Sequence, residues 1–351
     1  MGGYRGLPTH GDLPRRWSDL SGTLWWYAVR RAFDSFLRLQ SIDLAAALTF
    51  YSVLALVPAF MIVLALLSFI DLDERTAGLI VSVLRSVAPE TVAQSLEQPL
   101  YGFSQRGLSP VSLVIMIVFT VATASVYLGA LGRMLNRVYE VMEGRPLLLL
   151  PPIQYFTTLA LIVGAAVIAV FLLGSPGIVA AFGTMIGVPD TVVMVWNALR
   201  WPALLLVSML TVMIIYRSGP NVRSQGLRWI LPGSVLAVIL GGSASWALTA
   251  YVAQMTPRLD LTYGALSGSI VLLLWLWVCN LAVITGGVLN AELGRARRLA
   301  AGLPAEDDQL SPPIDTQRST PFAARRRRLV LEGRRHRRRS VQGFGRGADP
   351  Q

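Results

Sequence analysis

The sequence has few of the residues that carry acid–base or metal chemistry. It contains no lysine, two histidines, His10 and His336, and a single cysteine, Cys279. One cysteine excludes an intramolecular disulfide framework. No HxxH, CxxC or clustered carboxylates are present to hold zinc, and no GxxxxGK[ST] motif is present to hold nucleotide phosphates. We therefore expect no catalytic residues, no metal and no cofactor, and do not expect an enzyme.

Charged residues are also scarce. They make up 15% of the 351 positions, whereas hydrophobic residues make up 54% and gather in long blocks. A helix rises ~1.5 Å per residue, so such blocks can cross a hydrocarbon core of ~30 Å. The sequence predicts an all-α polytopic membrane protein whose six transmembrane helices form a bundle. The predicted spans are about 42–70, 110–131, 153–173, 194–216, 229–252 and 264–293.

The segments outside the spans divide the chain further. Residues 1–23 are polar and contain Gly and Pro, which predicts a mobile N-terminal segment ahead of a membrane domain over 24–298. Residues 24–40 form an amphipathic pattern with two Trp, one Tyr and a basic face, which favours a helix in the headgroup layer. The alternative is a helix packed on other protein. Residues 299–351 are Arg-rich without an apolar period, and predict a disordered cytoplasmic tail.

Arginine is unevenly divided between the segments that join the predicted spans. The segments before the first span, between the second and third, between the fourth and fifth, and after the sixth hold 6, 3, 3 and 14 arginines. The segments on the opposite side hold 3, 0 and 1. Positive residues concentrate on the cytoplasmic side of a membrane. We therefore predict a multi-pass protein of the bacterial cytoplasmic membrane with both termini in the cytoplasm.

Several polar residues fall at membrane depth. An amide in the middle of a span is costly unless a neighbouring helix provides a hydrogen-bond partner. One interpretation is a polar path or cavity lined by such groups. The other is structural, because Ser and Thr hydroxyls can bond to carbonyls of their own helix. The candidate residues for a polar path are Asn280, Tyr51, Thr49, Thr123 and Tyr127.

Proline and glycine mark places where a span could bend or pack closely. Pro58 removes a helical hydrogen bond and predicts a kink in the first span. Gly264 and Gly268 form a GxxxG pair, which favours close helix packing. Gly286 and Gly287 allow either close packing or a flexible turn that permits motion. These five residues are the hinge or packing candidates.

Polar residues at the predicted cytoplasmic ends of the spans form a third group. We expect Asn136, Glu140, Asn221, Asn290 and Glu292 to lie at the cytoplasmic interface. Glu292 lies near Arg295, which favours a salt bridge or an interface anchor. Arg200 falls inside the fourth span. It needs a carboxylate or a water-filled cavity if the helix starts near Thr191, whereas it reaches the outer headgroups if the helix starts near Asn197, which we favour.

The tail carries two runs of arginine. Such runs near the inner leaflet attract anionic lipids at about 1 kcal/mol per residue. Nucleic acid is not expected as a partner because no aromatic platform accompanies the runs. The alternative is a solvated tail that only reinforces topology. The candidate lipid contacts are Arg325, Arg326, Arg327, Arg328, Arg337, Arg338 and Arg339.

Short motifs distributed over about 24–298 form an ordered set. They are AAALTFYSVLALVPA at 45–59, LNRVYEVMEGR at 135–145, YRSGPN at 216–221, PG at 232–233, TYG at 262–264, LLLWLWV at 272–278 and GGVLNAELGR at 286–295. This set resembles the YihY/BrkB family of bacterial inner-membrane proteins, some of whose members are labelled virulence factors. The resemblance implies six membrane helices and no mapped catalytic mechanism.

The resemblance leaves the function open among three hypotheses. Family members are linked to serum resistance and envelope properties, and some are treated as candidate transporters. We favour a carrier or lipid-handling protein for a small or amphipathic substrate. The alternative is a scaffold that organises envelope proteins, with 75–100 and the tail as docking surfaces, or that assembles with copies of itself. An older family label, ribonuclease BN, is disfavoured because acid–base and metal-binding residues are lacking.

Overall fold

The computed structural model describes most of the chain in nine ranges. They are 13–14, 16–67, 110–146, 150–173, 179, 189–223, 226–263, 267–306 and 312–346. The described residues are helical apart from turns, loops and one isolated bridge between Val222 and Pro313. The described elements are a 3-10 helix, η2 (Trp17–Asp19), and the helices α1 (Gly22–Arg38), α2 (Ser41–Leu67), α5 (Pro110–Val138), α6 (Leu150–Leu173), α8 (Asp190–Ser218), α9 (Leu227–Tyr263), α10 (Ser267–Ala300) and α11 (Ser319–Arg346).

Several of these helices have the length and the apolar composition of membrane spans. Within the described residues, four stretches are long and apolar enough to cross a membrane: Val118–Val138, Thr191–Ser218, Leu227–Val252 and Gly268–Ala300. Two shorter apolar helical stretches are Ser41–Ala55 and Gln154–Ile168. The described parts of the six predicted spans fall on helices α2, α5, α6, α8, α9 and α10, and four of these helices contain a stretch that could cross a membrane, so the count of six stays a prediction.

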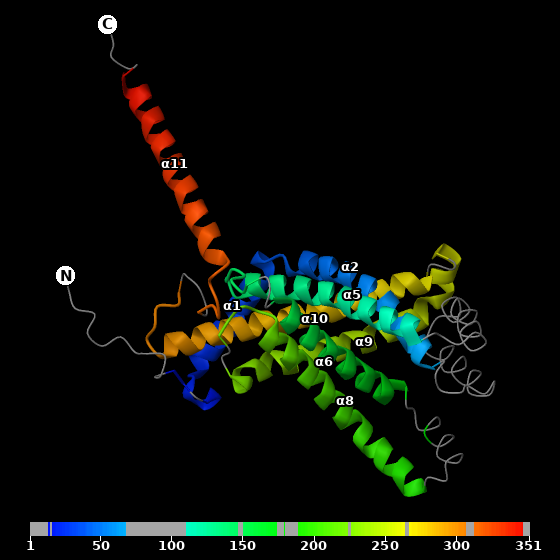
Figure 1. The fold of residues 1–351 in the computed structure, drawn as a ribbon. Coiled ribbons are helices and arrows are strands. Elements are labelled where there is room, and N and C mark those ends of the chain that lie inside the picture. The colour runs from blue at the N-terminus through cyan, green and yellow to red at the C-terminus, as the bar shows by residue number, and fades with distance from the viewer. Residues whose placement is uncertain are drawn as a thin grey trace.

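Helix α10 lies at the centre of the bundle and packs against α9, α1, α2 and α5, while α6 packs against α5 and α8 (Figure 1). The buried core joins these helices through side chains such as Leu131, Leu135 and Ile284, which are fully buried. The outer faces carry large exposed apolar side chains; Phe156 of α6 is 77% exposed and Trp246 of α9 is 75% exposed. Faces of this kind are stable against lipid rather than water.

One end of the bundle gathers most of the described polar contacts, and we call it the charged end. It comprises α1, the loop between α5 and α6, the loop between α8 and α9, the last turns of α10 and the base of α11. Because α2 begins there, α5 ends there, α6 begins there and α8 ends there, successive described helices alternate in direction (Figure 1).

The helix α1 differs from both sequence interpretations taken alone. Its inner face is mixed: Ala28 is fully buried in a cluster with Leu293 and Ala296 of α10, and Ser35 is 3% exposed and bonds to Glu292. Large apolar side chains face outward, with Trp26 70% and Phe33 68% exposed. The helix is thus packed on α10 through apolar and polar groups together, while its exposed face carries large apolar and charged side chains, as a helix at a membrane interface does.

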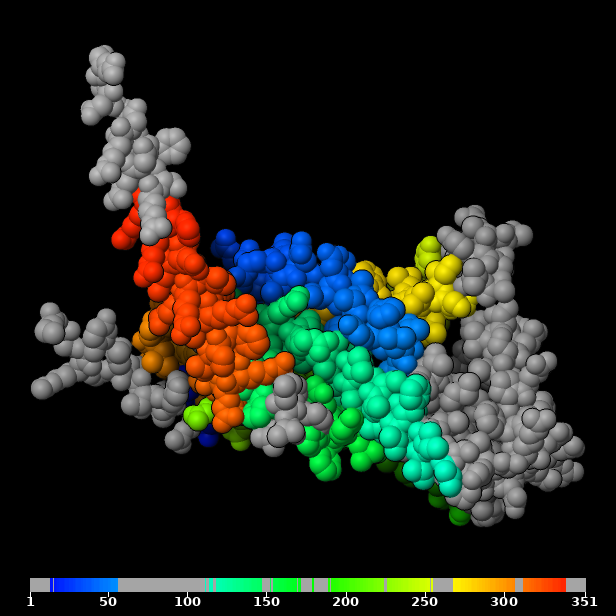
Figure 2. All heavy atoms as spheres, turned by 45° about the horizontal axis from the view of Figure 1, so that its top comes forward, coloured from blue at the N-terminus to red at the C-terminus, as the bar shows by residue number. Residues whose placement is uncertain are grey.

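Within residues 299–351, for which the sequence predicts a disordered tail, Ser319–Arg346 forms the helix α11, which projects from the bundle (Figures 1 and 2). Arg, Ala and Leu are strong helix formers, and low hydrophobicity excludes a packed core rather than a helix. The segment before α11 is also held: the N–H of Arg318 donates to the carbonyl of Gly144 at 3.0 Å.

Part of the segment 1–23, which the sequence predicts to be mobile, contacts the bundle in the structure. The indole of Trp17 donates to the carbonyl of Arg228 at 3.0 Å, and Arg297 donates to the carbonyl of Pro14 at 2.7 Å. Arg228 lies four residues before Pro232, which has no N–H to complete the helical bond to that carbonyl. The N-terminal segment therefore supplies a donor that α9 itself lacks.

Candidate functional site

A cluster of polar side chains joins three helices near the middle of the bundle. The hydroxyl of Tyr127 on α5 donates to Oδ1 of Asn280 on α10 at 2.9 Å. Nδ2 of Asn280 donates to Oγ of Ser52 at 3.1 Å and to Oγ1 of Thr49 at 3.3 Å, both on α2, and to its own helix at the carbonyl of Leu276 at 3.0 Å. Asn280 lies twelve residues before Glu292, or ~18 Å along the helix, which is near mid-membrane for a ~30 Å core. We call these four side chains, Asn280, Tyr127, Thr49 and Ser52, the Asn280 cluster.

Two members of the Asn280 cluster are buried, whereas Tyr127 and Ser52 are half-buried. Asn280 is 4% exposed and Thr49 is 6% exposed. The hydroxyls of Thr49 and Ser52 also donate to carbonyls of α2 itself, those of Ala45 at 2.8 Å and Leu48 at 3.0 Å. They therefore keep a hydrogen bond whether or not the Asn280 amide is present.

The structure brings three of the five path candidates together and separates the other two. Asn280, Thr49 and Tyr127 meet in the cluster, and Ser52, which is not one of the five, joins them. Thr123 lies one turn away on α5 and bonds to carbonyls of its own helix. Tyr51 packs at the edge of the core with its ring against Phe50. A contact across 231 residues, such as that of Thr49 with Asn280, leaves no signal in a single sequence.

Asn290 forms a second polar contact, where α9 and α10 cross. Its Oδ1 accepts from the N–H of Gly233 at 2.8 Å and its Nδ2 donates to the carbonyl of Ile230 at 2.9 Å. The backbones approach closely because a Cβ at Gly233 or at Gly286 would fall inside contact distance of the carbonyl of the other. The two sequence motifs PG and GGVLNAELGR therefore form one crossing point.

The remaining hinge or packing candidates do not lie together in one site. Gly287 is buried, and a Cβ there would meet side chains of α5 and α8. Gly268 is buried in the first turn of α10, whereas Gly264 lies outside the described residues. Pro58 lies within α2, which is helical on both sides of it.

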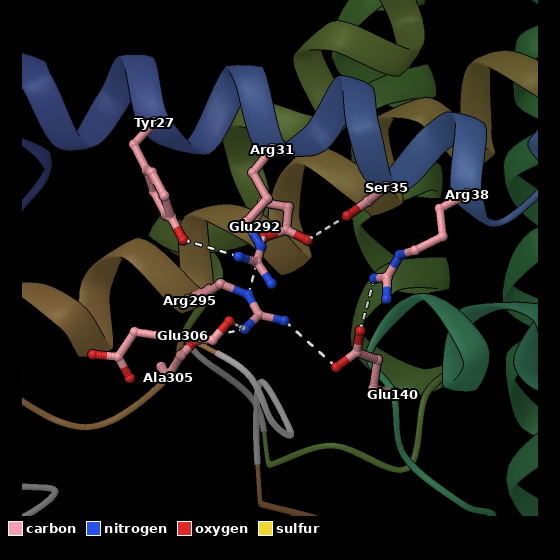
Figure 3. A network of polar contacts seen from close by, with 9 residues as sticks. All are labelled: Tyr27, Arg31, Ser35, Arg38, Glu140, Glu292, Arg295, Ala305 and Glu306. Atoms are coloured by element: carbon pink, nitrogen blue, oxygen red, sulfur yellow. Dashed lines mark hydrogen bonds and ion pairs between the residues drawn. The ribbon is translucent and has the colours of Figure 1, made fainter.

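Glu292 is the centre of a charged network at the charged end (Figure 3). Its Oε1 accepts from the hydroxyl of Ser35 on α1 at 2.7 Å. Its Oε2 lies 3.2 Å from Nε of Arg31 and 3.1 Å from Nε of Arg295. Glu292 is 2% and Arg295 0% exposed, so the pair is buried. Removing one partner of a buried ion pair costs about 3–5 kcal/mol, because the other charge is left unpaired.

Arg295 extends this network to the tail and to α5 (Figure 3). Its Nη1 donates to the carbonyls of Ala305 and Glu306, and its Nη2 lies 3.4 Å from Oε2 of Glu140. Glu140 also accepts from Nη2 of Arg38 at 2.8 Å, which raises the pKa of Arg38. A single buried guanidinium thus holds together α10, the start of the tail and the end of α5.

Glu140 has an unusual backbone for a residue with a side chain. Its φ is 54°, and the N–H of Val141 bonds to the carbonyl of Asn136 at 2.9 Å, which is the Schellman end of a helix. Glycine usually occupies this position, and another residue there costs about 1 kcal/mol. The ion pairs of Glu140 with Arg38 and Arg295 offset that cost.

Asn136 and Asn221 come together at the charged end. Oδ1 of Asn136 accepts from the N–H of Asn221 at 2.6 Å. Nδ2 of Asn221 donates to the carbonyls of Met142 at 3.1 Å and Asp315 at 2.8 Å. Asn221 is fully buried, so one amide connects the α5–α6 loop, the α8–α9 loop and the tail.

The ion pair of Glu143 with Arg145 was not singled out from the sequence. Oε1 and Oε2 of Glu143 each accept at 2.8 Å from Nε and Nη2 of Arg145. Arg145 also donates to the carbonyls of Ser218 and Gly219 on the α8 side. Burial opposes ionisation of Glu143, but the paired guanidinium outweighs it and lowers its pKa. The sequence signal for this ion pair is the short spacing of Glu143 and Arg145, which form the EGR at the end of the motif LNRVYEVMEGR.

The position of Arg200 differs from the interpretation that we favoured, in which the helix starts near Asn197 and Arg200 reaches the outer headgroups. Helix α8 begins at Asp190 rather than near Asn197, so Arg200 lies well inside it. Its Nε donates to the carbonyl of Phe171 at the end of α6 at 2.6 Å, and its guanidinium lies 5.2 Å from the ring of Trp201. A helix-terminal carbonyl is a favourable partner for a cation.

The candidate lipid contacts lie along α11. The side chains of Arg325, Arg326, Arg327, Arg328, Arg337 and Arg338 are exposed, and Arg339 lies on the same helix. His336 also lies on α11. In the part of the chain that the structure describes, no three His, Cys, Asp or Glu side chains come together in a way that could hold a metal ion.

Comparison with known proteins agrees with the arrangement of these motifs. The chain is 27% identical over 255 residues to YfkH of Bacillus subtilis, named a "putative ribonuclease-like protein", covering 73% of this chain and 90% of that one. It is 26% identical to the UPF0761 membrane protein Smlt0865 of Stenotrophomonas maltophilia over 72% of this chain, and 27% identical to a UPF0761 membrane protein of Janthinobacterium over 79%.

The chain spans 57% and 60% of the length of these two UPF0761 proteins. No solved structure matches the chain. The model of the family described as Virulence factor BrkB matches residues 32–309, which include the Asn280 cluster, the α9–α10 crossing and part of the charged end. This membrane protein therefore belongs to the Virulence factor BrkB family.

Proposed function

We propose that this protein is a carrier of the bacterial cytoplasmic membrane that handles lipids or another amphipathic substrate of the cell envelope. The Asn280 cluster carries the proposal. A polar side chain at mid-membrane is costly, and such residues face bundle interiors and mark substrate pathways. Here one amide reaches hydroxyls on two other helices, so it closes the space between α2, α5 and α10.

The partners of Asn280 suit a contact that opens and closes. Thr49 and Ser52 keep their bonds to α2 carbonyls when the amide leaves, so separation exposes no unsatisfied hydroxyl. Only the amide and the Tyr127 hydroxyl then need new partners, which water or a polar headgroup provides. In this proposal the described arrangement is the closed state.

The proposed topology has six spans with both termini in the cytoplasm. The alternation of α2, α5, α6, α8, α9 and α10 supports this count, because α1 and the base of α11 share the charged end. The charged end also carries most of the arginines outside the spans, which supports a cytoplasmic orientation of this end.

A non-transporting scaffold is the second candidate. The projecting helix α11, with its exposed arginines, favours it because such a helix offers a docking surface outside the bundle (Figure 2). The closed centre fits a scaffold as well as a closed carrier, so an activity measurement must distinguish them.

The test is lipid movement in vesicles. Purified full-length protein is placed in phosphatidylcholine–phosphatidylglycerol vesicles with a trace of fluorescent phosphatidylglycerol, and dithionite bleaches the outer leaflet. We expect the wild type to bring inner-leaflet lipid to the surface. Asn280→Leu keeps the volume but removes the amide, and should slow this movement about tenfold or more, because a headgroup that passes through the opened bundle then lacks a hydrogen bond worth about 1.4 kcal/mol, which is a factor of ten.

Thr285→Val is the matched control. Thr285 lies on the same helix and bonds to the carbonyl of Leu281 in its own helix at 2.8 Å, so its loss should change the rate less than about twofold. Lipid movement at the wild-type rate in Asn280→Leu would show that the Asn280 cluster has no role in that movement. If dithionite bleaches the same fraction of fluorescent lipid in wild-type vesicles as in protein-free vesicles, the result would contradict lipid movement and favour the scaffold.

A further inference from the structure

A pocket of about 420 Å³ opens at the charged end, away from the Asn280 cluster. It lies between the last turns of α5, the first turns of α6, the end of α8 and the base of α11. Its polar lining includes Arg133, Glu143, Arg145, Gln154 and Arg318. The pocket therefore collects three guanidinium groups and a single carboxylate from separate parts of the chain.

The carboxylate in the pocket is already neutralised. Both oxygens of Glu143 accept from Arg145, and Oε2 also accepts from Nδ2 of Asn136 at 2.9 Å. Arg145 in turn directs its remaining donors to the carbonyls of Ser218 and Gly219. The pair contributes no net charge, so the other two arginines, Arg133 and Arg318, give the pocket an excess of two positive charges.

Two nitrogen donors from different helices converge over Gly129. A Cβ built at Gly129 would lie 3.2 Å from Nε2 of Gln154 on α6 and 3.4 Å from Nη1 of Arg133 on α5. Glycine leaves this space open to the pocket. An amide N–H and a guanidinium N–H that face one small space are suited to a shared oxygen atom, and charge-assisted bonds of this kind are the stronger ones.

The pocket also has apolar lining residues, and its position matches the headgroup layer. Leu128, Met142 and Phe322 line the pocket, and the latter two are more than half exposed. Arg133 follows the predicted end of its span at 131, and Gln154 begins the next span. An anionic group with apolar substituents finds both kinds of surface here.

We propose that this pocket binds a phosphate group, held by Arg133, Gln154 and Arg318, with Leu128, Met142 and Phe322 against its apolar substituents. The shared chemistry is a phosphate mono- or diester, which an anionic phospholipid headgroup or a soluble phosphate can supply. Basic pockets between membrane helices hold lipid headgroups in this way. The site is independent of the carrier proposal, because a scaffold can bind a headgroup without moving it.

The position of Arg318 links this site to the tail. Arg318 lies directly before α11, and its N–H bonds to the carbonyl of Gly144 in the α5–α6 loop. A Cβ at Gly144 would fall inside contact distance of the backbone of Asp315, so the tail lies directly on this loop. A bound phosphate therefore joins α5 and α6 to the base of α11.

The test measures binding rather than movement. Full-length protein in detergent is titrated with dioctanoyl phosphatidylglycerol, dioctanoyl phosphatidylcholine, glycerol 3-phosphate and inorganic phosphate, and bound ligand is counted by native mass spectrometry. We expect phosphatidylglycerol to bind. Arg133→Gln and Arg318→Gln should each weaken it about tenfold or more. Binding of phosphatidylglycerol without the soluble phosphates identifies a lipid; equal binding of the soluble phosphates identifies a free phosphate ester.

Two further variants separate the pocket from general surface charge. Arg137→Gln removes an exposed arginine one turn away on α5, outside the pocket, and should change binding less than about twofold. Gly129→Ala keeps the charge but fills the space between Gln154 and Arg133, and should weaken binding as the arginine variants do. Equal losses in Arg137→Gln and Arg133→Gln, or equal binding of phosphatidylcholine, would overturn the proposal. These outcomes leave the Asn280 proposal untouched.

Discussion

Asn280 and Glu292 are both buried polar residues of α10, yet their partners differ in kind. Asn280 bonds to hydroxyls that have second partners in their own helix. Glu292 faces the guanidinium of Arg295, which is itself fully buried. Separation of the first set exposes one amide and one phenol, whereas separation of the second exposes charges. At the residue scale, the middle of the bundle can open at lower cost than the charged end.

Glu143 predicts a pH dependence of stability. Its pKa is lowered from its ordinary value of about 4.5, so its contribution is present above that value and is lost as the pH falls through the folded-state pKa. Glu143→Gln should lower the unfolding free energy near pH 7 by about 1–3 kcal/mol, because Arg145 loses a charged partner. The stability of the wild type and of Glu143→Gln is measured by thermal unfolding in detergent between pH 3 and 7.

The two curves should converge as the pH falls below about 4.5. Glu332→Gln on the exposed helix α11 is the control, and should follow the wild type at each pH. A Glu143→Gln curve parallel to the wild type across this range would show that the Arg145 pair does not stabilise the fold through its charge.

At the scale of elements, the α9–α10 crossing depends on the absence of a side chain. A Cβ at Gly286 would fall inside contact distance of the carbonyl of Gly233 and the hydroxyl of Tyr216. Gly286→Ala should therefore destabilise the protein by about 1–3 kcal/mol, since the helices must separate. Gly242→Ala on α9 meets nothing within 4 Å and should be neutral or stabilising, by up to about 1 kcal/mol, from helix propensity. Equal melting temperatures for the two variants would show that the close approach of α9 and α10 at Gly286 does not contribute to stability.

The sequence predicts where the helices lie better than where they end. Apolar content marks lipid depth, so the second span was ended at 131, whereas α5 continues to Val138. The extra turns carry Leu135 and Val138, which are buried against protein rather than lipid. In α9 the helix continues to Tyr263, beyond the predicted end at 252, because a helix needs only local hydrogen bonds and not apolar surroundings.

Partners were less predictable than elements. Asn280 requires a partner from another helix, and the sequence indicates as much, but it cannot choose between Tyr51 and Tyr127 on different helices. The bond of Asn136 with Asn221 joins residues 85 positions apart, although both lie in motifs that the sequence singles out. Such pairs depend on how helices pack, which a single sequence does not encode in any local pattern.

At the scale of the molecule, α10 holds its three polar sites at different depths. Asn280 lies near the middle, Asn290 at the α9 crossing, and Arg295 at the charged end, where it also bonds to the start of the tail. The apolar faces outside this axis, on α8 and α9, are largely uncovered by protein. This arrangement places rigid contacts at one end and a separable contact in the middle.

Orientation in the membrane is the last property that this arrangement predicts. In a Cys279→Ser background, single cysteines are introduced by Arg223→Cys in the α8–α9 loop, Thr320→Cys on α11 and Thr191→Cys at the opposite end of α8, all at exposed positions. Because arginine concentrates at the charged end, that end should face the cytoplasm. A membrane-impermeant maleimide should then label Thr191→Cys in intact spheroplasts, and the other two only after permeabilisation. The parent without cysteine controls for background. Labelling of Arg223→Cys or Thr320→Cys in intact cells would invert the topology, and with it the cytoplasmic side assigned to the phosphate pocket.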